Sequence, residues 1–302
     1  MKSLRPTLLA ALPLVVVASL AAAAEKAAPP KRIRYGRGRL VCTLACREVD
    51  ESSGLTHSRR NPGVFWTHND SGNDARLFAF DLKGRHLGTY AVAGARSRDW
   101  EDIASVSLGN RHFLLICDTG DNHLMRPFVT LYLVPEPAID LKKPKAGGKL
   151  KVVQTIHFTF EDGPQDCESV AVDSTTATVY LVSKRVKRTV YELPLPRKAV
   201  SKGLVAKAIA RLDIFQAVGM DMSPDGLRAV VLTYGDAYEY SRSPGEKWSA
   251  AFRRPGRKLS MPGRRQGESI CYGPDGKTLY LTSEKLPAPL LEVPVLPDGV
   301  RK

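Results

Sequence analysis

The sequence predicts an all-β protein, a single β-propeller of five four-stranded blades. Three observations support this prediction. A short motif returns after 48, 67, 50 and 50 residues, and each copy is followed by the same succession of strands and turns. The last repeat lacks one strand, which the amino-terminal part of the chain can supply. Periods of about this length, built from strands and turns, are typical of propeller blades.

The motif is clearest in residues 166–172, Asp-Cys-Glu-Ser-Val-Ala-Val, and its copies are aligned here on the glutamate of that stretch. The aligned positions are Ser53, Glu101, Glu168, Val218 and Glu268. The copy at Val218 is degenerate. It is placed by the turn at 222–226, which matches the turn at 272–276.

Each copy begins a half-apolar strand, and a turn then leads to a strongly apolar second strand rich in β-branched and aromatic residues. The expected second strands are 64–67, 113–117, 179–182, 229–232 and 279–282. Third strands such as 77–80 and weaker fourth strands such as 89–92 follow them. Four strands per repeat make one blade.

The two ends of the chain are expected to complete one blade together. The last repeat reaches a third strand near 290–295 and then stops, while an unassigned strand at 40–44 precedes the first motif. Pairing of these strands would close the ring and remove the exposed edges of an open sheet. A ring of six blades and an open sandwich are the alternatives.

The chain is expected to comprise a signal peptide (1–24), a flexible basic arm (25–39) and one propeller domain (40–302). The first segment has a basic start, an apolar run and small residues at 22–24. These features predict cleavage near Ala24 and a secreted or periplasmic protein, with an uncleaved anchor as the alternative. The apolar run is too short, and too interrupted at Pro13, for a comfortable membrane span. The arm is rich in basic residues, Pro and Gly.

The long interval of 67 residues places an insertion in the second repeat, around Glu136 and 141–148. We expect a solvated loop there. Of the five cysteines, Cys117, Cys167 and Cys271 lie in apolar strands and are expected to be small buried residues. Cys42 and Cys46 are too far apart along an extended strand to form a disulfide without a bend.

The chain is basic, with 45 Lys and Arg residues against 31 Asp and Glu residues and a net charge of +14. The basic clusters are scattered over loops of several repeats, and no nucleic-acid-binding motif accompanies them, so a nucleic-acid partner is not expected. An anionic polymer of the cell envelope, or solubility alone, explains the charge. The chain is expected to be a monomer.

The repeated glutamates predict a metal site. The first strand of each propeller blade lines the central channel, so the five aligned positions would form one ring with three carboxylates. Three crowded negative charges repel one another unless they are protonated or share a cation. Calcium suits such a ring because it accepts irregular coordination by six to eight oxygen atoms. In the alternative, each Glu accepts backbone N–H groups and fastens neighbouring blades together.

Polar residues follow the expected second strands, at the rim where the first strands begin. We expect these residues to gather with Asp99, Asp102, Asp166 and the glutamate ring. The candidate ligand-binding residues of this rim are His68, Asn69, Asp102, Asp121, Asn122 and Lys184, and the polar strand ends also include Tyr234 and Glu284.

Three strand starts, at 51–55, 100–104 and 267–270, resemble those of the calcium-activated nucleotidase (apyrase) family. That family is a five-bladed propeller whose central calcium is held by Glu and Ser side chains. The resemblance implies ligand roles for Ser53, Glu101, Glu168 and Glu268. That family has Ser at the position of Val218, so this sequence departs from the pattern there.

The resemblance to the nucleotidases covers only these short segments, and the other active-site segments of that family are not found. The mature chain as a whole also looks like a group of exported bacterial propellers with no assigned activity. The stretches that carry this likeness are His-Asn-Asp-Ser-Gly at 68–72 and Asp-Trp-Glu-Asp-Ile-Ala at 99–104.

Two functions are compatible with these patterns. The first is a calcium-stapled binding or scaffold module at the cell envelope. The second is a calcium-dependent hydrolase of phosphate esters or anhydrides, nucleotidase-like or phytase-like, which takes a small phosphorylated ligand. In the hydrolase, Asp70, Asp99 or Asp118 would orient or deprotonate water, and Lys184 or His68 would neutralise developing charge. No nucleophile–base pair and no phosphate-binding glycine loop is present, which favours the binding module.

Overall fold

The computed structural model describes residues 28, 30–198 and 203–297, and this part of the chain is all-β. Its one helix is the short α1 (Trp248–Ala251). The predicted signal peptide lies outside the described residues. Within them, no helix combines the length and the apolar character needed to cross a membrane.

The first sheet has the strand order β2-β3-β4-β5-β9. Its strands are β2 (Ser52–His57), β3 (Val64–Asn69), β4 (Arg76–Asp81), β5 (His86–Ala93) and β9 (Gly147–Lys151). The first four form an antiparallel meander, whereas β9 joins β5 in parallel. The prediction of a solvated loop is therefore wrong for residues 147 and 148, which begin β9 and belong to this sheet.

An eight-stranded sheet consists of two antiparallel meanders in the order β6-β7-β8-β10 and β14-β13-β12-β11. The first half contains β6 (Trp100–Leu108), β7 (Arg111–Asp118), β8 (Val129–Pro135) and β10 (Gln154–Phe160). The second contains β11 (Cys167–Asp173), β12 (Thr178–Ser183), β13 (Thr189–Pro194) and β14 (Leu204–Arg211). Parallel pairing of β10 with β14 joins the two halves at their outer edges.

Two four-stranded sheets complete the fold. One contains β15 (Ala217–Met222), β16 (Arg228–Thr233), β17 (Ala237–Ser241) and β18 (Arg257–Leu259). The other contains β19 (Ser269–Tyr272), β20 (Leu279–Thr282), β21 (Pro289–Val293) and β1 (Arg39–Thr43). Antiparallel pairing of β1 with β21 confirms that the two ends of the chain complete one sheet.

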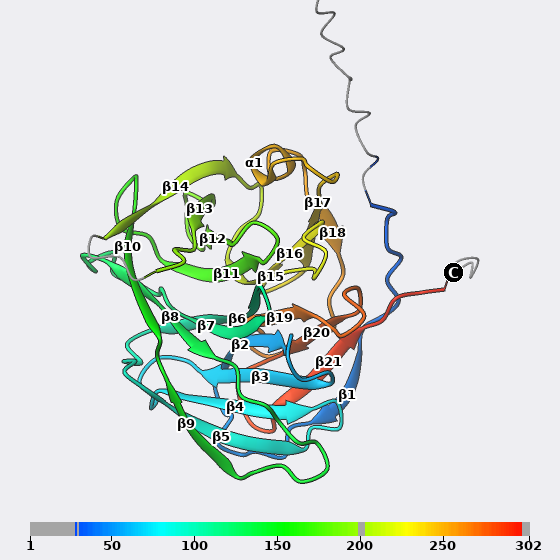
Figure 1. Ribbon diagram of the computed structural model, residues 1–302. Coiled ribbons are helices and arrows are strands. Elements are labelled where there is room, and N and C mark those ends of the chain that lie inside the picture. Colours follow the sequence, from blue (N-terminus) through cyan, green and yellow to red (C-terminus); the bar gives the residue numbers. More distant parts are fainter. Residues whose placement is uncertain (1–27, 29, 199–202, 298–302) are drawn as a thin grey trace, which may run out of the picture.

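The first strands of the meanders contact one another in a closed cycle. β2 contacts β6, β6 contacts β11, β11 contacts β15, β15 contacts β19, and β19 contacts β2. In Figure 1 these strands lie near the middle of the molecule, and the last strands of the meanders, such as β5 and β14, lie at its periphery. This arrangement agrees with the predicted radial architecture, while the number of blades stays a prediction.

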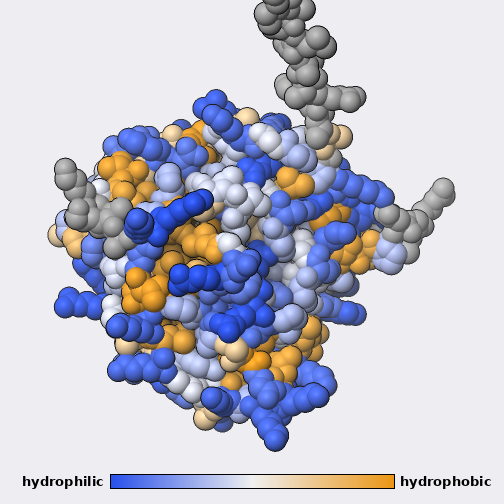
Figure 2. All heavy atoms as spheres, viewed as in Figure 1, coloured by the Kyte–Doolittle hydropathy of each residue, from blue (hydrophilic) through white to orange (hydrophobic). Residues whose placement is uncertain are grey.

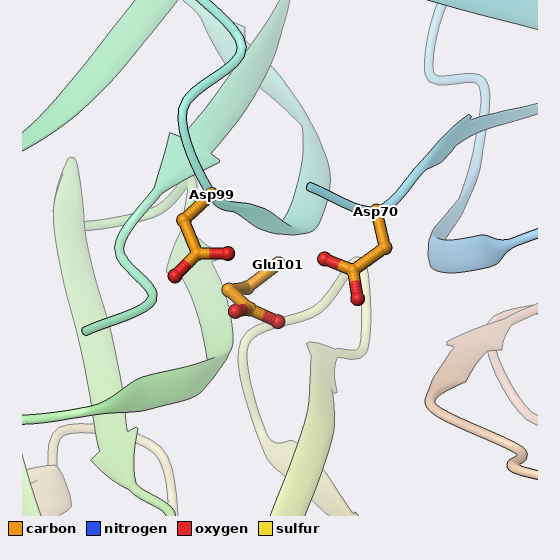
Figure 3. A group of neighbouring side chains, drawn as sticks. All are labelled: Asp70, Asp99 and Glu101. Atoms are coloured by element: carbon orange, nitrogen blue, oxygen red, sulfur yellow. The ribbon is translucent and has the colours of Figure 1, made fainter. Parts of the chain in front are cut away.

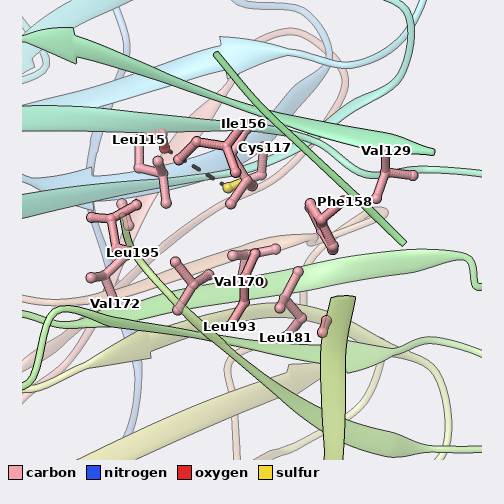
Figure 4. Packing of buried hydrophobic residues seen from close by; sticks show 14 of the residues in the cluster. Leu115, Cys117, Val129, Ile156, Phe158, Val170, Val172, Leu181, Leu193 and Leu195 are labelled. Carbon is pink, nitrogen blue, oxygen red and sulfur yellow. Dashed lines mark hydrogen bonds between the residues drawn. The ribbon is translucent and has the colours of Figure 1, made fainter. Parts of the chain in front are cut away.

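Hydrophobic side chains fill the space between neighbouring meanders. The largest cluster lies between β6, β7, β8 and β10 on one side and β11 to β13 on the other; Figure 4 shows part of it, including Leu115, Val170 and Leu181. Because both faces of these strands are covered, strands such as β3, β11 and β16 are buried along their whole length. Continuous burial explains why the second strands are apolar throughout rather than alternating. In the view of Figure 2, hydrophobic residues form several separate patches between hydrophilic ones.

The amino-terminal arm is not free where it is described. The Gly36 N–H donates to the Pro294 carbonyl at 2.8 Å, and Tyr35 forms a β-bridge with Val295. The Tyr35 hydroxyl also donates to Glu239 at 2.7 Å. The prediction of a flexible arm is therefore wrong for this part, which runs beside the carboxyl-terminal segment (Figure 1).

Two further predictions concern side chains. Glu136, predicted to lie in a solvated loop, is fully buried and accepts hydrogen bonds from Trp66 Nε1 at 2.8 Å and Ser105 Oγ at 3.2 Å. The burial of the three strand cysteines is confirmed. All five cysteines are free thiols.

Candidate metal centre

The first strands share a backbone irregularity at the aligned motif position. In β2, β6, β11 and β15, pairing with the following strand skips one residue, and the skipped residues are Ser53, Glu101, Glu168 and Val218. A bulge of this kind leaves one residue without a ladder partner and redirects its side chain. In the fifth meander Glu268 immediately precedes the first paired residue, Ser269. The sequence motif thus corresponds to a repeated local structure.

Seven carboxylates gather where the first strands begin, and we call them the acidic cluster. They are Asp70, Asp99, Glu101, Asp166, Glu168, Glu268 and Glu284. They form three overlapping groups, and within each group the carboxylate oxygens lie within 4.8 Å of one another. Asp70 and Glu101 each belong to two groups, so the cluster is continuous. Figure 3 shows the carboxylates of Asp70, Asp99 and Glu101 pointing toward one another.

Four of the five meanders contribute carboxylates to the acidic cluster. Some residues stand at or just before the start of a first strand, and others just after the end of a second strand. The remaining meander, β15 to β18, contributes a hydroxyl: Tyr234 Oη donates to Glu268 Oε1 at 2.5 Å. The cluster therefore depends on all five meanders being in place.

Basic side chains balance only part of this charge. Lys184 pairs with Glu168, Arg185 Nε lies 3.0 Å from Asp166, and Lys285 Nζ lies 3.7 Å from Glu284. Asp70, Asp99, Glu101 and Glu268 have no Lys, Arg or His nitrogen within 4.0 Å among the described residues. The cluster therefore carries an excess of negative charge when its members are ionised.

Burial makes ionisation of these carboxylates costly. It raises the pKa of Glu101 well above its usual value, and the Glu168 carboxylate adds to the effect. Burial also raises the pKa of Glu168 to about 8, although the charge of Lys184 acts in the opposite direction. Burial, together with neighbouring carboxylates, raises the pKa of Asp70 to about 6 and that of Glu284 to about 7. Near neutral pH the cluster is therefore short of positive charge or hydrogen-bond donors.

Three features of the cluster fit a hard divalent cation. Every cluster ligand is an oxygen atom. Glu168 Oε2 is buried and has no hydrogen-bond partner. Gly120 lies so close that a Cβ atom there would overlap the carboxylates of Glu101 and Asp99. Calcium binds sets of carboxylate oxygens of this kind. A buried oxygen without a hydrogen-bond partner needs such a compensating charge or a donor.

The two motif positions without a carboxylate differ from each other. Ser53 is buried, and its hydroxyl donates to the Glu101 carbonyl at 3.2 Å, which fastens β2 to β6 and leaves the oxygen able to accept or to ligate. Val218 is fully buried in a hydrophobic cluster with Val230 and Ile270. It leaves the ring without an oxygen ligand from that side chain.

Two predicted rim residues are occupied by backbone hydrogen bonds instead. Asp102 is 1% exposed and accepts from the N–H groups of Ile103, Val170 and Met220, at 2.9, 2.9 and 3.2 Å. Asp121 accepts the N–H groups of residues 125 and 126, each at 2.9 Å. Neither belongs to the acidic cluster.

Three other predicted residues also lie outside the cluster. Asp118 is buried and forms an ion pair with Arg126 at 2.7 Å. This ion pair makes its carboxylate a poor base. His68 is fully buried, and burial lowers its pKa to about 4, so it is neutral and does not supply a cation. The Asn69 amide donates to the Glu48 carbonyl at 2.7 Å.

Two predicted rim residues do lie beside the cluster. Lys184 Nζ contacts both Glu168 and the Tyr234 hydroxyl, the latter at 3.0 Å. Burial acts to lower the pKa of Lys184, but the charge and hydrogen bond of Glu168 raise it overall. Asn122 Oδ1 accepts from Arg185 Nη2 at 2.7 Å at the surface.

Three residues at the acidic cluster were expected at the rim but were not predicted as site residues: Asp166, Tyr234 and Glu284. Asp166 stands two residues before Glu168, as Asp99 does before Glu101, and that shared spacing is a usable signal. Tyr234 and Glu284 occupy strand ends corresponding to those of Asp70 and Lys184. Gly120 has no comparable signal, because its role depends on a close approach in space.

Comparisons with known proteins do not identify a family. No protein-family model matches the chain, and no curated protein matches it. Among solved structures, hydrazine synthase from Kuenenia stuttgartiensis is similar, with 13% sequence identity and a TM-score of 0.41. The similarity covers 80% of this chain and 57% of that one, so this chain spans less than two thirds of that structure's length. The resemblance to the nucleotidases therefore rests on the short sequence motifs.

Proposed function

We propose that this chain is a five-bladed β-propeller with a calcium ion at the mouth of its central channel. The blades would be β2–β5, β6–β8 with β10, β11–β14, β15–β18, and β19–β21 with β1. The closed cycle of contacts among the five first strands supports this division. β9 would be an addition to the first blade.

The buried, unpartnered Glu168 Oε2 within seven clustered carboxylates is the observation that carries the calcium proposal. Such an oxygen costs free energy unless a cation or a donor compensates it. Glu101, Glu168 and Glu268 would ligate the ion with Ser53, and Asp70, Asp99, Asp166 and Glu284 would provide further oxygens. Calcium would then join blades that otherwise repel one another at this end.

We propose that the protein acts as a calcium-stapled binding module at the cell envelope. The bound cation would hold the rim in one arrangement. The basic surface elsewhere favours an anionic envelope polymer as partner. This proposal includes export of the chain, a monomeric state and no nucleic-acid partner. Cell fractionation and light scattering test the first two, and a gel-shift assay tests the third.

Thermal unfolding of the mature protein in EDTA and in calcium tests the metal site. At a free calcium concentration about 100 times the Kd, binding adds about 2.7 kcal/mol to the free energy of unfolding. For a domain of this size, that corresponds to a rise in Tm of roughly 5–10 °C. Glu168→Gln should reduce the rise to less than half.

The matched control is Glu192→Gln in β13, outside the acidic cluster, which should keep the full calcium effect. Absence of any calcium effect in the wild-type protein would refute the metal site. An effect of equal size in wild type, Glu168→Gln and the control would place the ion elsewhere.

A calcium-dependent hydrolase of phosphate esters or anhydrides is the second candidate, and Asp70 favours it. This half-buried carboxylate is shared by two groups of the cluster, and burial raises its pKa to about 6. In this second candidate Asp70 would not ligate the ion but would accept a proton from water near neutral pH. A bound calcium ion would supply polarisation of a phosphoryl oxygen. Asp118, paired with Arg126, and His68, buried and neutral, are not part of this candidate mechanism.

Phosphate release from p-nitrophenyl phosphate, ADP and phytate distinguishes the two functions. A hydrolase should release phosphate in calcium and not in EDTA, and Asp70→Asn should lower kcat at least 100-fold while calcium still raises the Tm. A protein that binds calcium but releases no phosphate from any of the three is the binding module.

A further inference from the structure

A second cleft, separate from the acidic cluster, lies between the loop preceding β6 and the strands β8 and β10. Its volume is about 410 Å³, within the range of roughly 300–1,000 Å³ that is usual for small-molecule sites. Its basic and aromatic lining residues are Arg96, Arg98, Arg126, Phe128, Tyr132 and His157. We call it the arginine cleft.

The arginine cleft has an excess of positive charge. Three guanidinium groups line it, and its one acidic side chain, Asp118, is already paired with Arg126. Arg96 and Arg98 are exposed, and neither has a carboxylate within 4.0 Å in the part of the chain that the structure describes. The charge balance of the cleft is therefore +2, which a doubly charged anion would neutralise.

Arg126 is held rigidly and has a donor to spare. Its side chain is only 5% exposed, and Nη1 lies 2.7 Å from both Asp118 Oδ1 and the Gly120 carbonyl. Arg126 Nε is buried and has no hydrogen-bond partner. Arg126 also lines the cleft, so an oxyanion bound there would lie beside a guanidinium group whose position is already fixed.

The opposite wall of the cleft offers hydroxyl groups and rings. The Tyr132 oxygen accepts from the Arg96 N–H at 3.4 Å, so its own proton can point to a ligand. The Phe128 ring is 45% exposed, and its centroid lies 4.6 Å from that of His157, with the rings inclined at 58°. Thr130 Oγ1 lies 3.1 Å from His157 Nδ1 and fixes the imidazole. An apolar ring next to several cations suits a ligand with a ring and an anionic group.

We propose that the arginine cleft binds a small phosphate monoester whose ester group carries a ring. The phosphate would lie among the three guanidinium groups, because arginine matches the spacing of phosphate oxygens with two parallel hydrogen bonds. The dianion matches the charge of the cleft. The ring of the ligand would pack on Phe128 and His157.

This site uses no residue of the acidic cluster and needs no bound cation. It therefore goes beyond the calcium proposal and can fail or succeed on its own. Titration calorimetry with phenyl phosphate, in EDTA and at low salt, measures it directly. Glu168→Gln should leave the affinity for phenyl phosphate unchanged.

The decisive variant is Arg96→Gln combined with Arg98→Gln. Both side chains are exposed, so the fold should be retained, and the affinity for phenyl phosphate should fall at least tenfold. The matched control is Arg111→Gln with Arg197→Gln, which removes the same charge from another cleft. Equal loss in the two double variants, or no binding by the wild-type protein at millimolar phenyl phosphate, would overturn the proposal.

The ring contact is tested with methyl phosphate and inorganic phosphate. Phe128→Ala should weaken phenyl phosphate about fivefold and leave the affinities of the two smaller anions unchanged. If the wild-type protein binds inorganic phosphate and phenyl phosphate with equal affinity, the cleft is a site for the free ion. That result would contradict the proposal that the ligand carries a ring.

Discussion

Two neighbouring residues of β6 have carboxylates in opposite surroundings. Asp102 points into the packed interior and accepts three backbone N–H groups, one each from β6, β11 and β15. Glu101 lies among other carboxylates. Burial raises the pKa of both side chains, but backbone hydrogen bonds oppose the rise at Asp102, whereas neighbouring carboxylates add to it at Glu101. Both side chains are almost completely buried, so exposure does not distinguish them.

The difference between these surroundings separates carboxylates that join sheets from carboxylates that we propose as ligands of a cation. Interior carboxylates such as Asp102, Asp221 and Glu136 receive hydrogen bonds from neighbouring sheets, and thereby join them. In the acidic cluster, by contrast, Glu168 Oε2 has no hydrogen-bond partner, and under our proposal the cluster destabilises the fold when no cation is present. The same kind of side chain thus joins neighbouring sheets in the interior and, under our proposal, binds a cation in the acidic cluster.

Removal of the Asp102 carboxylate should have the largest effect. Asp102→Ala leaves three buried N–H groups without an acceptor and should lower the free energy of unfolding by about 4 kcal/mol. The loss, measured by urea unfolding, should be the same in EDTA and in calcium. Glu101→Ala is the paired variant and should cost less than about 1 kcal/mol in EDTA, since it also relieves repulsion. Similar costs for the two variants in EDTA would contradict the comparison.

The pH dependence of stability should depend on calcium. Glu168 and Glu284 have pKa values raised to about 8 and about 7 in the folded protein, mainly by burial. The folded state then holds protons more tightly than the unfolded state, so the free energy of unfolding falls as pH rises from about 4.5 to 8. We expect a fall of several kcal/mol in EDTA, since one unit of pKa shift corresponds to about 1.4 kcal/mol.

Calcium should remove most of this fall, because a cation stabilises the ionised carboxylates. Urea unfolding at pH values from 5 to 9, with and without calcium, measures the difference. The interior carboxylates contribute equally to both series and cancel. Identical pH profiles in the two series would show that the titrating groups do not meet the ion.

Gly120→Ala should weaken calcium binding with a smaller effect on stability. The new Cβ would push aside the Glu101 and Asp99 carboxylates, and calcium affinity should fall about tenfold, or 1.4 kcal/mol. Gly263→Ala is the control, because nothing lies within 4 Å of a Cβ at that position. Calorimetric titration with calcium measures both. Unchanged affinity in Gly120→Ala would mean that these two carboxylates do not hold the ion.

The repeat spacing predicted the radial sheets and the pairing of the two ends, because strand order follows from local sequence. It also predicted that Glu101, Glu168 and Glu268 converge, and all three belong to the acidic cluster, although Glu268 is grouped with Asp70 and Glu284 rather than with the other two. It did not separate Glu101 from Asp102. That distinction depends on the bulge at Glu101, which sends consecutive side chains to different surroundings. The motif marks the position of the bulge, but the change of register appears only in the strand pairing.

Long-range contacts account for the other differences. Gly147 to Lys151 are polar and exposed on one side, and their pairing with β5 depends on the neighbouring meander rather than on their own composition. Glu136 looked like a loop residue because its buried partners, Trp66 and Ser105, are distant in sequence. The sequence likewise does not predict that Arg126 pairs with Asp118, because the two residues approach each other only in the folded loop.

The pairing of β1 with β21 has a consequence for biosynthesis. Arg39 is among the first described residues to leave the ribosome, and its partner Glu292 is made some 250 residues later. Until then β1 has no sheet to join. The fifth sheet can therefore be completed only after β21 has been made, and loop closure over so long a distance is slow. A chain stopped short of β21 would expose an unpaired strand at each end, the form most prone to aggregate.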